Sequence, residues 1–419
     1  MAGLADSAGC REDNSNMGSE KYDVVVVGGG PAGLYAAELV SAAGKRTLLA
    51  DHKPSVGRKF LVAGRGGLNL THSEPVENFP ARYGDASGRW ETLLRDFPPE
   101  NLRAWAKDLG IDTFIGTSGR IFPTTKQAAP LLRRWIERLR KQGVSFHARY
   151  GLADFHSSTG NAWRIEFVTP HGSVSVETRA VILALGGASW PQTGSDGGWV
   201  DLFAKKGIQI TPLTPANCGY EVDWPAEFLA NAEGKPLKNL VVKAGDQSVA
   251  GELLVTKYGL EGGALYQLGR ILRTMEKPHL EIDLKPSSTA EKLAAKLRHV
   301  TAQNLPDHAA QAWRLTPAAA ALLRLRAPFE SAEQIATLAK SYPLDLRGFR
   351  PIEEAISTSG GVKWNELDSQ LMLKSHPGVF CAGEMIDWDA PTGGYLIQGC
   401  FSTATRAATG ALQFLTGLT

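Results

Sequence analysis

A glycine-rich turn between an apolar strand and a helix constrains this chain more than any other feature. Val24 to Val27 form a continuous β-branched run, which is typical of a parallel strand covered on both faces. The segment GGGPAG follows at residues 28–33, and residues 34–43 have the character of a helix. A second apolar strand is expected at residues 46–51. The segment therefore predicts a β-α-β unit.

The spacing of the glycines matches GxGxxG, the pattern of a dinucleotide-binding turn. Gly28 permits the tight turn, Gly30 lets backbone amides approach a pyrophosphate, and Gly33 lets the helix pack close to the strand. Asp51 ends the second strand, where a carboxylate binds ribose hydroxyls and repels a 2′-phosphate. A purely structural glycine turn is the alternative, and FAD and NAD both remain possible at this point. The predicted cofactor-binding residues of this segment are Gly28, Gly30, Pro31, Ala32, Gly33 and Asp51.

Later segments favour FAD over NAD. A second glycine-rich loop at 57–71 carries basic residues that can balance phosphate charge, and another glycine pair ends the strand expected near 181–185. Residues 378–387 indicate a strand ending in Ala-Gly-Glu, followed by an aspartate that can bind ribityl hydroxyls. The pair Gly393-Gly394 opens a last helix, whose N-terminus can stabilise negative charge at the flavin N1–C2=O edge. A simple NAD dehydrogenase needs no such distant second half-site.

The sequence resembles a family of bacterial flavoproteins with an inserted domain, which includes BaiN-type bile-acid reductases and aminoacetone oxidase. The resemblance covers nearly all of the chain after residue 21. It rests on VVVVGGGPAGLYAA, GRKFLVAGRGGLNLTH, ALGGASWPQTGSDG, LLVTKYGLEGGALYQL, STSGGV and VFCAGEMIDWDAPTGGYLIQGC. The chain departs from the usual family pattern at Arg65–Asn69 and at Glu261-Gly262-Gly263, which puts transfer of a known family substrate in doubt. Beyond the first turn, the expected contacts of a non-covalently bound FAD are Arg58, Lys59, Phe60, Arg65, Gly66, Asn69, Gly187, Gly383, Glu384, Asp387, Gly393, Gly394 and Tyr395.

The family implies an α/β fold in which an insertion splits one Rossmann-like FAD-binding domain of the glutathione-reductase type. We expect a disordered tail at 1–20 and the FAD-binding domain at 21–195 and 352–419. The insertion is expected to contain a β-barrel-like domain at 196–284 and 341–351 and a helical subdomain at 285–340. Helix starts are predicted in that subdomain by Ser288 with Glu291, by Thr316-Pro317, and by Ser331 with Gln334.

Candidate catalytic residues come from two places. Lys257, Tyr258 and Glu261 belong to the insertion and are expected to face the flavin, with an ordinary turn as the alternative. Tyr395 follows the last glycine pair, and its alternative role is structural. No second GxGxxG is present, so NAD(P)H is expected to reach the flavin only transiently, as an electron donor.

Composition narrows the remaining function classes. The formal net charge of +2 speaks against a nucleic-acid partner, and four scattered cysteines indicate neither a disulfide framework nor a metal site. Without a signal peptide or an apolar stretch of roughly 20 residues, we expect a cytoplasmic protein that does not enter membranes. The leading hypothesis is an FAD-dependent oxidoreductase acting on a small organic substrate, as reductase or oxidase. A flavin-dependent RNA-modifying protein and a flavin-binding sensor are the alternatives, and the sequence does not indicate an oligomeric state.

Overall fold

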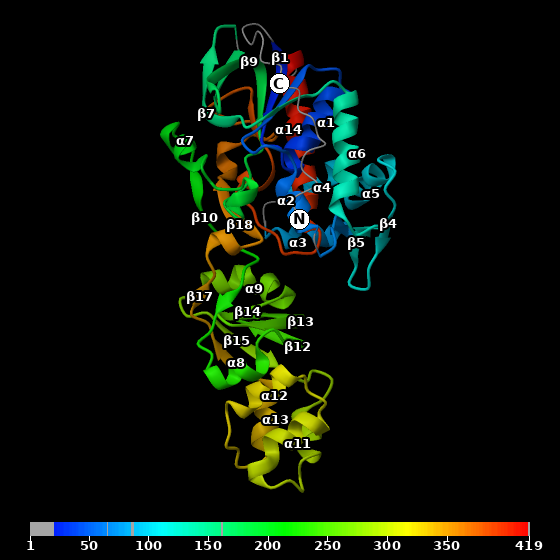
Figure 1. Ribbon diagram of the computed structural model, residues 1–419, viewed down its shortest axis with the longest axis vertical. Coiled ribbons are helices and arrows are strands. Elements are labelled where there is room, and N and C mark those ends of the chain that lie inside the picture. The colour runs from blue at the N-terminus through cyan, green and yellow to red at the C-terminus, as the bar shows by residue number, and fades with distance from the viewer. Residues whose placement is uncertain (1–20, 65, 85–87, 161, 418–419) are drawn as a thin grey trace. The chain divides into compact units, whose positions relative to one another are not determined.

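The computed structural model describes residues 21–64, 66–84, 88–160 and 162–417. The chain divides into two compact units, one formed by residues 1–214 and 358–419 and the other by residues 215–357 (Figure 1). Unit 1 is thus built from both ends of the sequence, as predicted. The predicted tail at 1–20 lies outside the described residues.

The boundaries of the two units differ from those predicted from the sequence. The segment 196–214 was assigned to the insertion, but it belongs to unit 1. The physical reason is burial, because Trp199, Phe203 and Ile208 pack into the hydrophobic core of that unit. The chain passes from one unit to the other within β10 (Ile210–Ala216) and β18 (Ser357–Val362), which pair as a two-stranded sheet.

The core of unit 1 is a seven-stranded sheet in the order β6-β2-β1-β9-β8-β7, with β19 also paired to β9. Strands β1, β2, β6, β9 and β19 pair in parallel, whereas β7 and β8 add an antiparallel meander. The valine run of β1 is fully covered, as a central parallel strand requires. The strands are β1 (Tyr22–Val27), β2 (Thr47–Asp51), β6 (Ser145–Ala148), β7 (Gly151–Ser158), β8 (Ala162–Thr169), β9 (Gly172–Leu183) and β19 (Val379–Cys381).

Strand β9 changes partner along its length. Its first part, from Gly172 to Thr178, pairs with β8. Its last part pairs with β1 on one side and, from Val181 to Leu183, with β19 on the other. Strand β19, from the C-terminal segment, therefore lies directly beside β9, and the glycine pair Gly186-Gly187 follows β9 in the chain.

Helices α1 and α14 pack together against this sheet (Figure 1). Helix α1 begins at Pro31, a favourable first position because proline lacks only an N–H that would be unpaired there. The unit contains a further three-stranded sheet, β3-β5-β4, formed by Thr71–His72, Arg120–Pro123 and Thr113–Ile115. The helices are α1 (Pro31–Ala42), α2 (Arg58–Ala63), α3 (Phe79–Arg82), α4 (Arg89–Asp96), α5 (Pro99–Asp108), α6 (Ala128–Lys141), α7 (Val200–Lys205) and α14 (Tyr395–Thr416).

Unit 2 combines a seven-stranded sheet, in the order β16-β15-β12-β13-β14-β11-β17, with six helices. In the described residues no strand ladder joins β16 to β17, so the sheet is open there rather than a closed barrel. Its strands are β11 (Tyr220–Glu221), β12 (Pro236–Ala244), β13 (Gln247–Thr256), β14 (Gly259–Glu261), β15 (His279–Asp283), β16 (Tyr342–Asp345) and β17 (Gly348–Phe349). Its helices are α8 (Ala226–Ala232), α9 (Gly263–Thr274), α10 (Ala290–Ala295), α11 (Leu305–Ala312), α12 (Pro317–Arg324) and α13 (Ala332–Lys340).

The predicted helical subdomain has no core of its own. Leu293, Trp313 and Leu322 belong to the same buried cluster as Val242 and Leu253 of the sheet. Helices and sheet therefore stabilise one another as a single unit.

Two of the three predicted helix starts in this region are confirmed. The hydroxyls of Thr316 and Ser331 accept hydrogen bonds from backbone N–H groups of the first turn. The third helix begins one residue later than predicted, because Thr289 rather than Ser288 caps it. In the described part of the chain, no helix is both long and apolar enough to cross a bilayer.

Candidate functional site

The first glycine turn has the geometry of a ligand-binding loop. Gly28 has a φ of 105°, and a Cβ there would lie 2.2 Å from the carbonyl oxygen of Ala184. A Cβ at Gly33 would lie 1.8 Å from the carbonyl oxygen of Gly28, so α1 can approach β1 only with glycine. Gly30 is different, because no atom lies within 4 Å of the position of its Cβ. The open side of the turn is thus at Gly30, where the helix N-terminus offers its N–H groups.

The carboxylate of Asp51 holds the ends of two loops. Its Oδ2 accepts a hydrogen bond of 2.7 Å from Gly29 N, and its Oδ1 accepts one of 2.7 Å from Lys53 N. The side chain is 14% exposed. A carboxylate has about four lone-pair sites, so two acceptor positions remain for hydroxyl groups of a ligand.

The imidazole of His52 lies near two carboxylates, those of Asp51 and Asp196. Its Nδ1 lies 3.9 Å from Asp51 Oδ1, and its Nε2 lies 3.6 Å from Asp196 Oδ2. Residues far apart in sequence therefore meet beside the glycine turn. The sequence contained no motif that pointed to His52.

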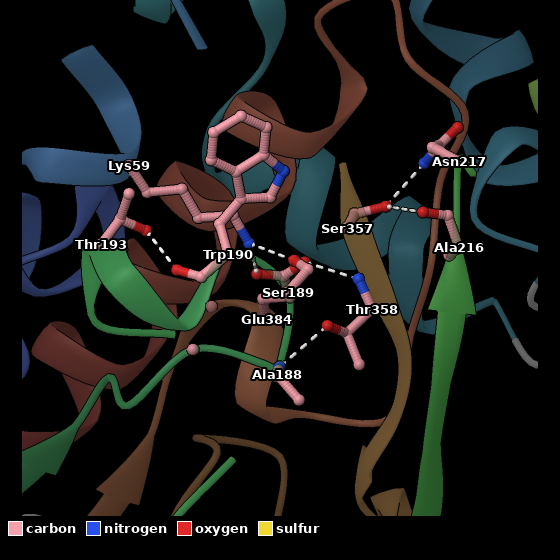
Figure 2. Close-up of polar contacts among 12 residues, drawn as sticks. Lys59, Ala188, Ser189, Trp190, Thr193, Ala216, Asn217, Ser357, Thr358 and Glu384 are labelled. Atoms are coloured by element: carbon pink, nitrogen blue, oxygen red, sulfur yellow. Dashed lines mark hydrogen bonds and ion pairs between the residues drawn. The ribbon is translucent and has the colours of Figure 1, made fainter. Parts of the chain in front are cut away.

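A second cluster joins four segments through Lys59 (Figure 2). Its ammonium group donates to Ser189 Oγ at 2.6 Å and forms an ion pair with Glu384 Oε2 at 3.0 Å. The other carboxylate oxygen of Glu384 accepts a 2.9 Å hydrogen bond from Thr358 N. This cluster ties α2 and β18 to the short helix at Gly383–Met385, and so links the two chain ends that build unit 1.

The packing of the loop after β9 requires glycine at position 187. The hydroxyl of Thr358 accepts a 2.9 Å hydrogen bond from Ala188 N (Figure 2). A Cβ at Gly187 would lie 2.4 Å from that hydroxyl oxygen. A side chain at position 187 would therefore break the contact between β18 and the loop that follows β9.

These segments enclose one pocket of unit 1. It contains nine of the predicted cofactor residues: Gly28, Gly30, Pro31, Ala32, Asp51, Arg58, Lys59, Gly383 and Glu384. It also contains polar residues that sequence analysis missed, notably His52, Ser55, Tyr150, Thr193, Ser195 and Cys400. They come from strand ends and loops without a motif, so only the tertiary fold identifies them.

Two polar atoms on the pocket wall indicate what the pocket binds. Arg58 Nε and Ser195 Oγ are buried without a hydrogen-bond partner in the described part of the structure. Leaving such atoms unpaired costs free energy, typically about 1–3 kcal/mol each. A ligand with phosphate and hydroxyl oxygens pairs with a guanidinium and a hydroxyl. Together with the glycine turn and Asp51, these residues fit the pyrophosphate and ribose groups of FAD.

Other predicted cofactor residues lie outside the pocket lining. The ring of Phe60 is buried in the core and packs edge-on against Trp135 at 6.2 Å, so its contact with a flavin stays a prediction. Asp387 accepts a hydrogen bond of 2.5 Å from Thr211 Oγ1, and burial raises the pKa of its carboxyl group. Arg65 lies outside the described residues. The remaining members of this group are Gly33, Gly66, Asn69, Gly187, Gly393, Gly394 and Tyr395.

The start of α14 is held by close packing. Gly393 and Gly394 have φ angles of 135° and 105°, and a Cβ at Gly394 would lie 2.5 Å from the backbone of Thr71. Tyr395, which is only 5% exposed, donates from its hydroxyl to Glu74 Oε1 at 2.6 Å. Arg82 binds both oxygens of Glu74, at 2.9 and 2.6 Å. The phenol of Tyr395 is therefore engaged by the protein itself.

The three candidates of the insertion lie in unit 2. Tyr258 donates a hydrogen bond to Glu261, and the guanidinium of Arg350 lies 4.5 Å from the centre of the Tyr258 ring. Burial, and after it the Glu261 carboxylate, raises the pKa of Tyr258. Lys257 is exposed. Their role toward a flavin stays a prediction.

Unit 1 defines the class of this protein. Its parallel sheet, glycine turn and acid at the end of β2 form a Rossmann-type FAD-binding domain. The model of the HI0933-like protein Rossmann domain matches residues 22–410, and the chain belongs to this family. The predicted flavoprotein family and α/β fold class are thus confirmed.

Relatives with curated names match most of the chain. The ribosomal RNA dihydrouridine synthase of Escherichia coli (strain K12) is 25% identical over 406 residues, which are 93% of this chain and 98% of that protein. The protein of the same name from Haemophilus influenzae is 23% identical over 408 residues, with the same coverage. The 3-ketosteroid Δ1-dehydrogenase of Sterolibacterium denitrificans has a similar structure, with a TM-score of 0.53 and 12% identity over 95% of this chain and 100% of that one. This last similarity concerns the fold alone.

Proposed function

We propose that this chain is an FAD-dependent oxidoreductase that works as a reductase, transferring a hydride to a carbon–carbon double bond conjugated to a carbonyl group. The observation that carries the proposal is the pocket of unit 1, where residues from both chain ends meet at the ion pair of Lys59 and Glu384. A glycine turn and an aspartate alone would suit several nucleotides. The second half-site from the C-terminal segment suits the larger FAD.

The chain's own residues bind and orient the cofactor. Gly28 to Gly33 present backbone N–H groups to the pyrophosphate, and Asp51 accepts from ribose hydroxyls. The guanidinium of Arg58 compensates phosphate charge with its unpaired Nε. FAD supplies the hydride chemistry when it is bound, and the protein contributes position and electrostatics. We propose that NAD(P)H in solution reduces it, and that Tyr258 and Glu261 are the first substrate-contacting candidates to test.

An anaerobic absorbance titration with NADH and then NADPH tests the reductase proposal. The protein is expected to carry a flavin band at roughly 450 nm that bleaches rapidly with one of the two nucleotides. If a yellow protein does not bleach with either, the reductase half of the proposal is wrong, and an oxidase reduced by its own substrate replaces it. A colourless protein that FAD cannot reconstitute would overturn the cofactor assignment.

Asp51 gives a sharper test of the cofactor site. Asp51→Ala removes the acceptors for Gly29 N and Lys53 N, so it loosens the loops as well as the ribose contact. Asp51→Asn keeps one acceptor oxygen and is the better variant. We expect it to weaken FAD binding by roughly tenfold, as loss of a charged hydrogen-bond partner does. An unchanged dissociation constant in an equilibrium titration of the apoprotein would contradict the ribose contact.

Uridine in ribosomal RNA is a second candidate substrate. One observation favours it: this chain matches ribosomal RNA dihydrouridine synthases over 98% of their length. The uracil ring contains a double bond conjugated to a carbonyl, so its reduction is the same chemistry. The near-neutral net charge, from which we predicted no nucleic-acid partner, favours a small free substrate instead.

The two substrate classes are separable by one assay. The reduced protein is incubated with ribosomal RNA that lacks dihydrouridine, and the nucleosides are then analysed by mass spectrometry. New dihydrouridine would establish the RNA candidate. Reduction of small conjugated enones with no dihydrouridine in the RNA would establish the free substrate.

A further inference from the structure

A loop at residues 186–198, after β9, forms part of the pocket wall. Gly197 N donates to the carbonyl oxygen of Gly187 at 3.0 Å and closes the loop at its base. We call residues 190–196 of this loop the pocket strap. Three members of the strap line the cofactor pocket, namely Thr193, Gly194 and Ser195. The base of the loop is thus fixed in unit 1, while the middle of the strap faces the ligand space.

A single polar contact holds the strap from outside the loop. The imidazole Nε2 of His52 lies 3.6 Å from Asp196 Oδ2. Within the part of the chain that the structure describes, no other hydrogen bond or ion pair joins the strap to a residue outside 186–198. The backbone approaches the same side chain, because a Cβ at Gly194 would lie 3.1 Å from His52 Cε1. His52 is therefore the residue that connects the strap to the end of β2.

The same imidazole lies near the acid that holds the glycine turn. His52 Nδ1 is 3.9 Å from Asp51 Oδ1, and the other oxygen of Asp51 accepts from Gly29 N. A neutral imidazole carries one N–H donor, whereas a protonated imidazole carries two donors and a positive charge. Only protonated His52 can therefore attract Asp51 and Asp196 at the same time.

We propose that protonated His52 holds the strap closed over the pocket and thereby slows the release of FAD. A ligand that fills the pocket leaves faster when a segment of the wall is free to move. Histidine changes its charge between pH 5 and 8, so FAD is retained longer at the acidic end of this range. The inference rests on the FAD-binding part of the proposed function and is independent of the substrate.

His52 is the titrating group with this geometry. Besides the two carboxylates, the charged or titratable groups on the segments around it are Lys53, Arg58, His147, Arg149 and Tyr150. Lysine and arginine side chains keep their charge between pH 5 and 8. Burial raises the pKa of Tyr150, so its phenol stays neutral in this range. The ring of His147 packs against that of Tyr150 at 4.8 Å, and it is unchanged in every variant below.

The experiment measures the rate at which bound FAD is released. The protein is loaded with radiolabelled FAD and mixed with excess unlabelled FAD at about pH 6 or about pH 8, and the retained label is counted after rapid desalting. We expect the wild type to release FAD roughly two- to fivefold more slowly at the lower pH, the factor that a partly exposed ion pair supplies. His52→Gln removes the charge, and it is expected to show the faster rate at both pH values.

Asp196→Asn separates the strap from a direct effect of His52 on the phosphates. Asp196 is 47% exposed and is not among the described residues that line the pocket. If His52 attracted the phosphates directly, removing the negative charge of Asp196 would slow release. The strap predicts the opposite, so Asp196→Asn should release FAD as fast as His52→Gln at the lower pH. Release that is unchanged or slower would overturn the inference.

His156→Gln is the matched control. The Nε2 of His156 also lies near a carboxylate, at 3.4 Å from Asp154 Oδ2, but this pair lies on β7 outside the pocket lining. The variant is expected to release FAD like the wild type at both pH values. Loss of the pH dependence in this control, or a wild type with equal rates at both pH values, would overturn the inference alone. A protein that binds no labelled FAD at either pH would overturn the proposed function together with it.

Discussion

Each unit contains a tyrosine that donates to a glutamate beside an arginine, but the two groups differ in what holds the carboxylate. In unit 1, Arg82 binds both oxygens of Glu74, and its guanidinium also lies 5.6 Å from the ring of Tyr395. In unit 2, Arg350 lies over the ring of Tyr258 but forms its ion pairs with Glu221 and Glu354. In the described structure, Glu261 has no cation of its own.

We propose that this difference separates a structural group in unit 1 from a reactive group in unit 2. Burial alone would raise the pKa of Glu74, but hydrogen bonds from Arg82 and Tyr395 outweigh it and hold the pKa below the ordinary value of 4.5. The carboxylate of Glu74 is thus paired with Arg82 and the Tyr395 hydroxyl within unit 1. Glu261 keeps acceptor capacity for a proton or a substrate, which is the property a proton-transfer group needs.

The largest expected effect on stability is that of Glu74→Ala. It removes the partner of Arg82 and of the Tyr395 hydroxyl, and we expect the free energy of unfolding of unit 1 to fall by about 2–3 kcal/mol. The 39% exposure of Arg82 keeps the loss below that of a fully buried pair. Glu261→Ala is the matched variant in unit 2. It removes only the hydrogen bond from the neutral Tyr258 hydroxyl, and we expect the free energy of unfolding to fall by about 1 kcal/mol. Urea unfolding measures both, and equal losses would remove the distinction between the groups.

Acid should reveal the same difference. Because the pKa of Glu74 is lower in the folded than in the unfolded protein, its contribution is fully present above pH 4.5 and is lost as pH falls through the folded pKa. The stability difference between the wild type and Glu74→Gln should therefore be largest near neutral pH and shrink below pH 4.5. A difference that stays constant down to pH 3, roughly one unit or more below the usual carboxyl range, would contradict the charged pair.

Removal of the two hydroxyls gives the smallest effect on stability and the sharpest separation in activity. Tyr395→Phe is expected to cost about 1 kcal/mol, because one buried hydrogen bond is lost. Tyr258→Phe is expected to cost less in stability but to lower kcat by roughly 100-fold, the usual contribution of a general acid. Steady-state kinetics measure the split, with whichever of the two candidate substrate classes the assay of the reduced protein establishes. The reverse ranking in kcat would move the catalytic assignment to Tyr395.

Features that depend on the backbone could be predicted from the sequence. A Cβ at Gly28 or Gly33 would lie less than 3 Å from a neighbouring carbonyl group, so only glycine fits at these positions. Such a requirement is visible in the sequence as a glycine motif. Asp51 could be predicted because the end of the second strand of a β-α-β unit has a known position relative to the turn. Glu384 could be predicted because its motif ends a strand that returns to the same sheet.

Features that depend on tertiary packing could not be predicted from the sequence. Phe60 belongs to a cofactor motif, yet whether an α2 residue faces ligand or core is decided by Trp135, which is remote in sequence. Tyr150 and Ser195 carry no local signal, because they reach the pocket only through the ends of strands and loops. The unit boundary at Thr214 depends on the burial of Phe203, which periodicity within a six-residue helix does not reveal.

The partner change of β9 also sets the order in which this protein can mature on the ribosome. The first part of β9, from Gly172 to Thr178, can pair with β8 as soon as both have been synthesised, since a hairpin needs only local contacts. The last part of β9 can pair with β1 at once, but it gains its second neighbour only when β19 has been synthesised, and Glu384 and Cys400 follow later still. Unit 2, which ends at Ser357, leaves the ribosome complete before the pocket exists. Nascent chains that stop before Val379 therefore lack the wall that closes the cofactor site, and capture of FAD becomes the last step of biogenesis.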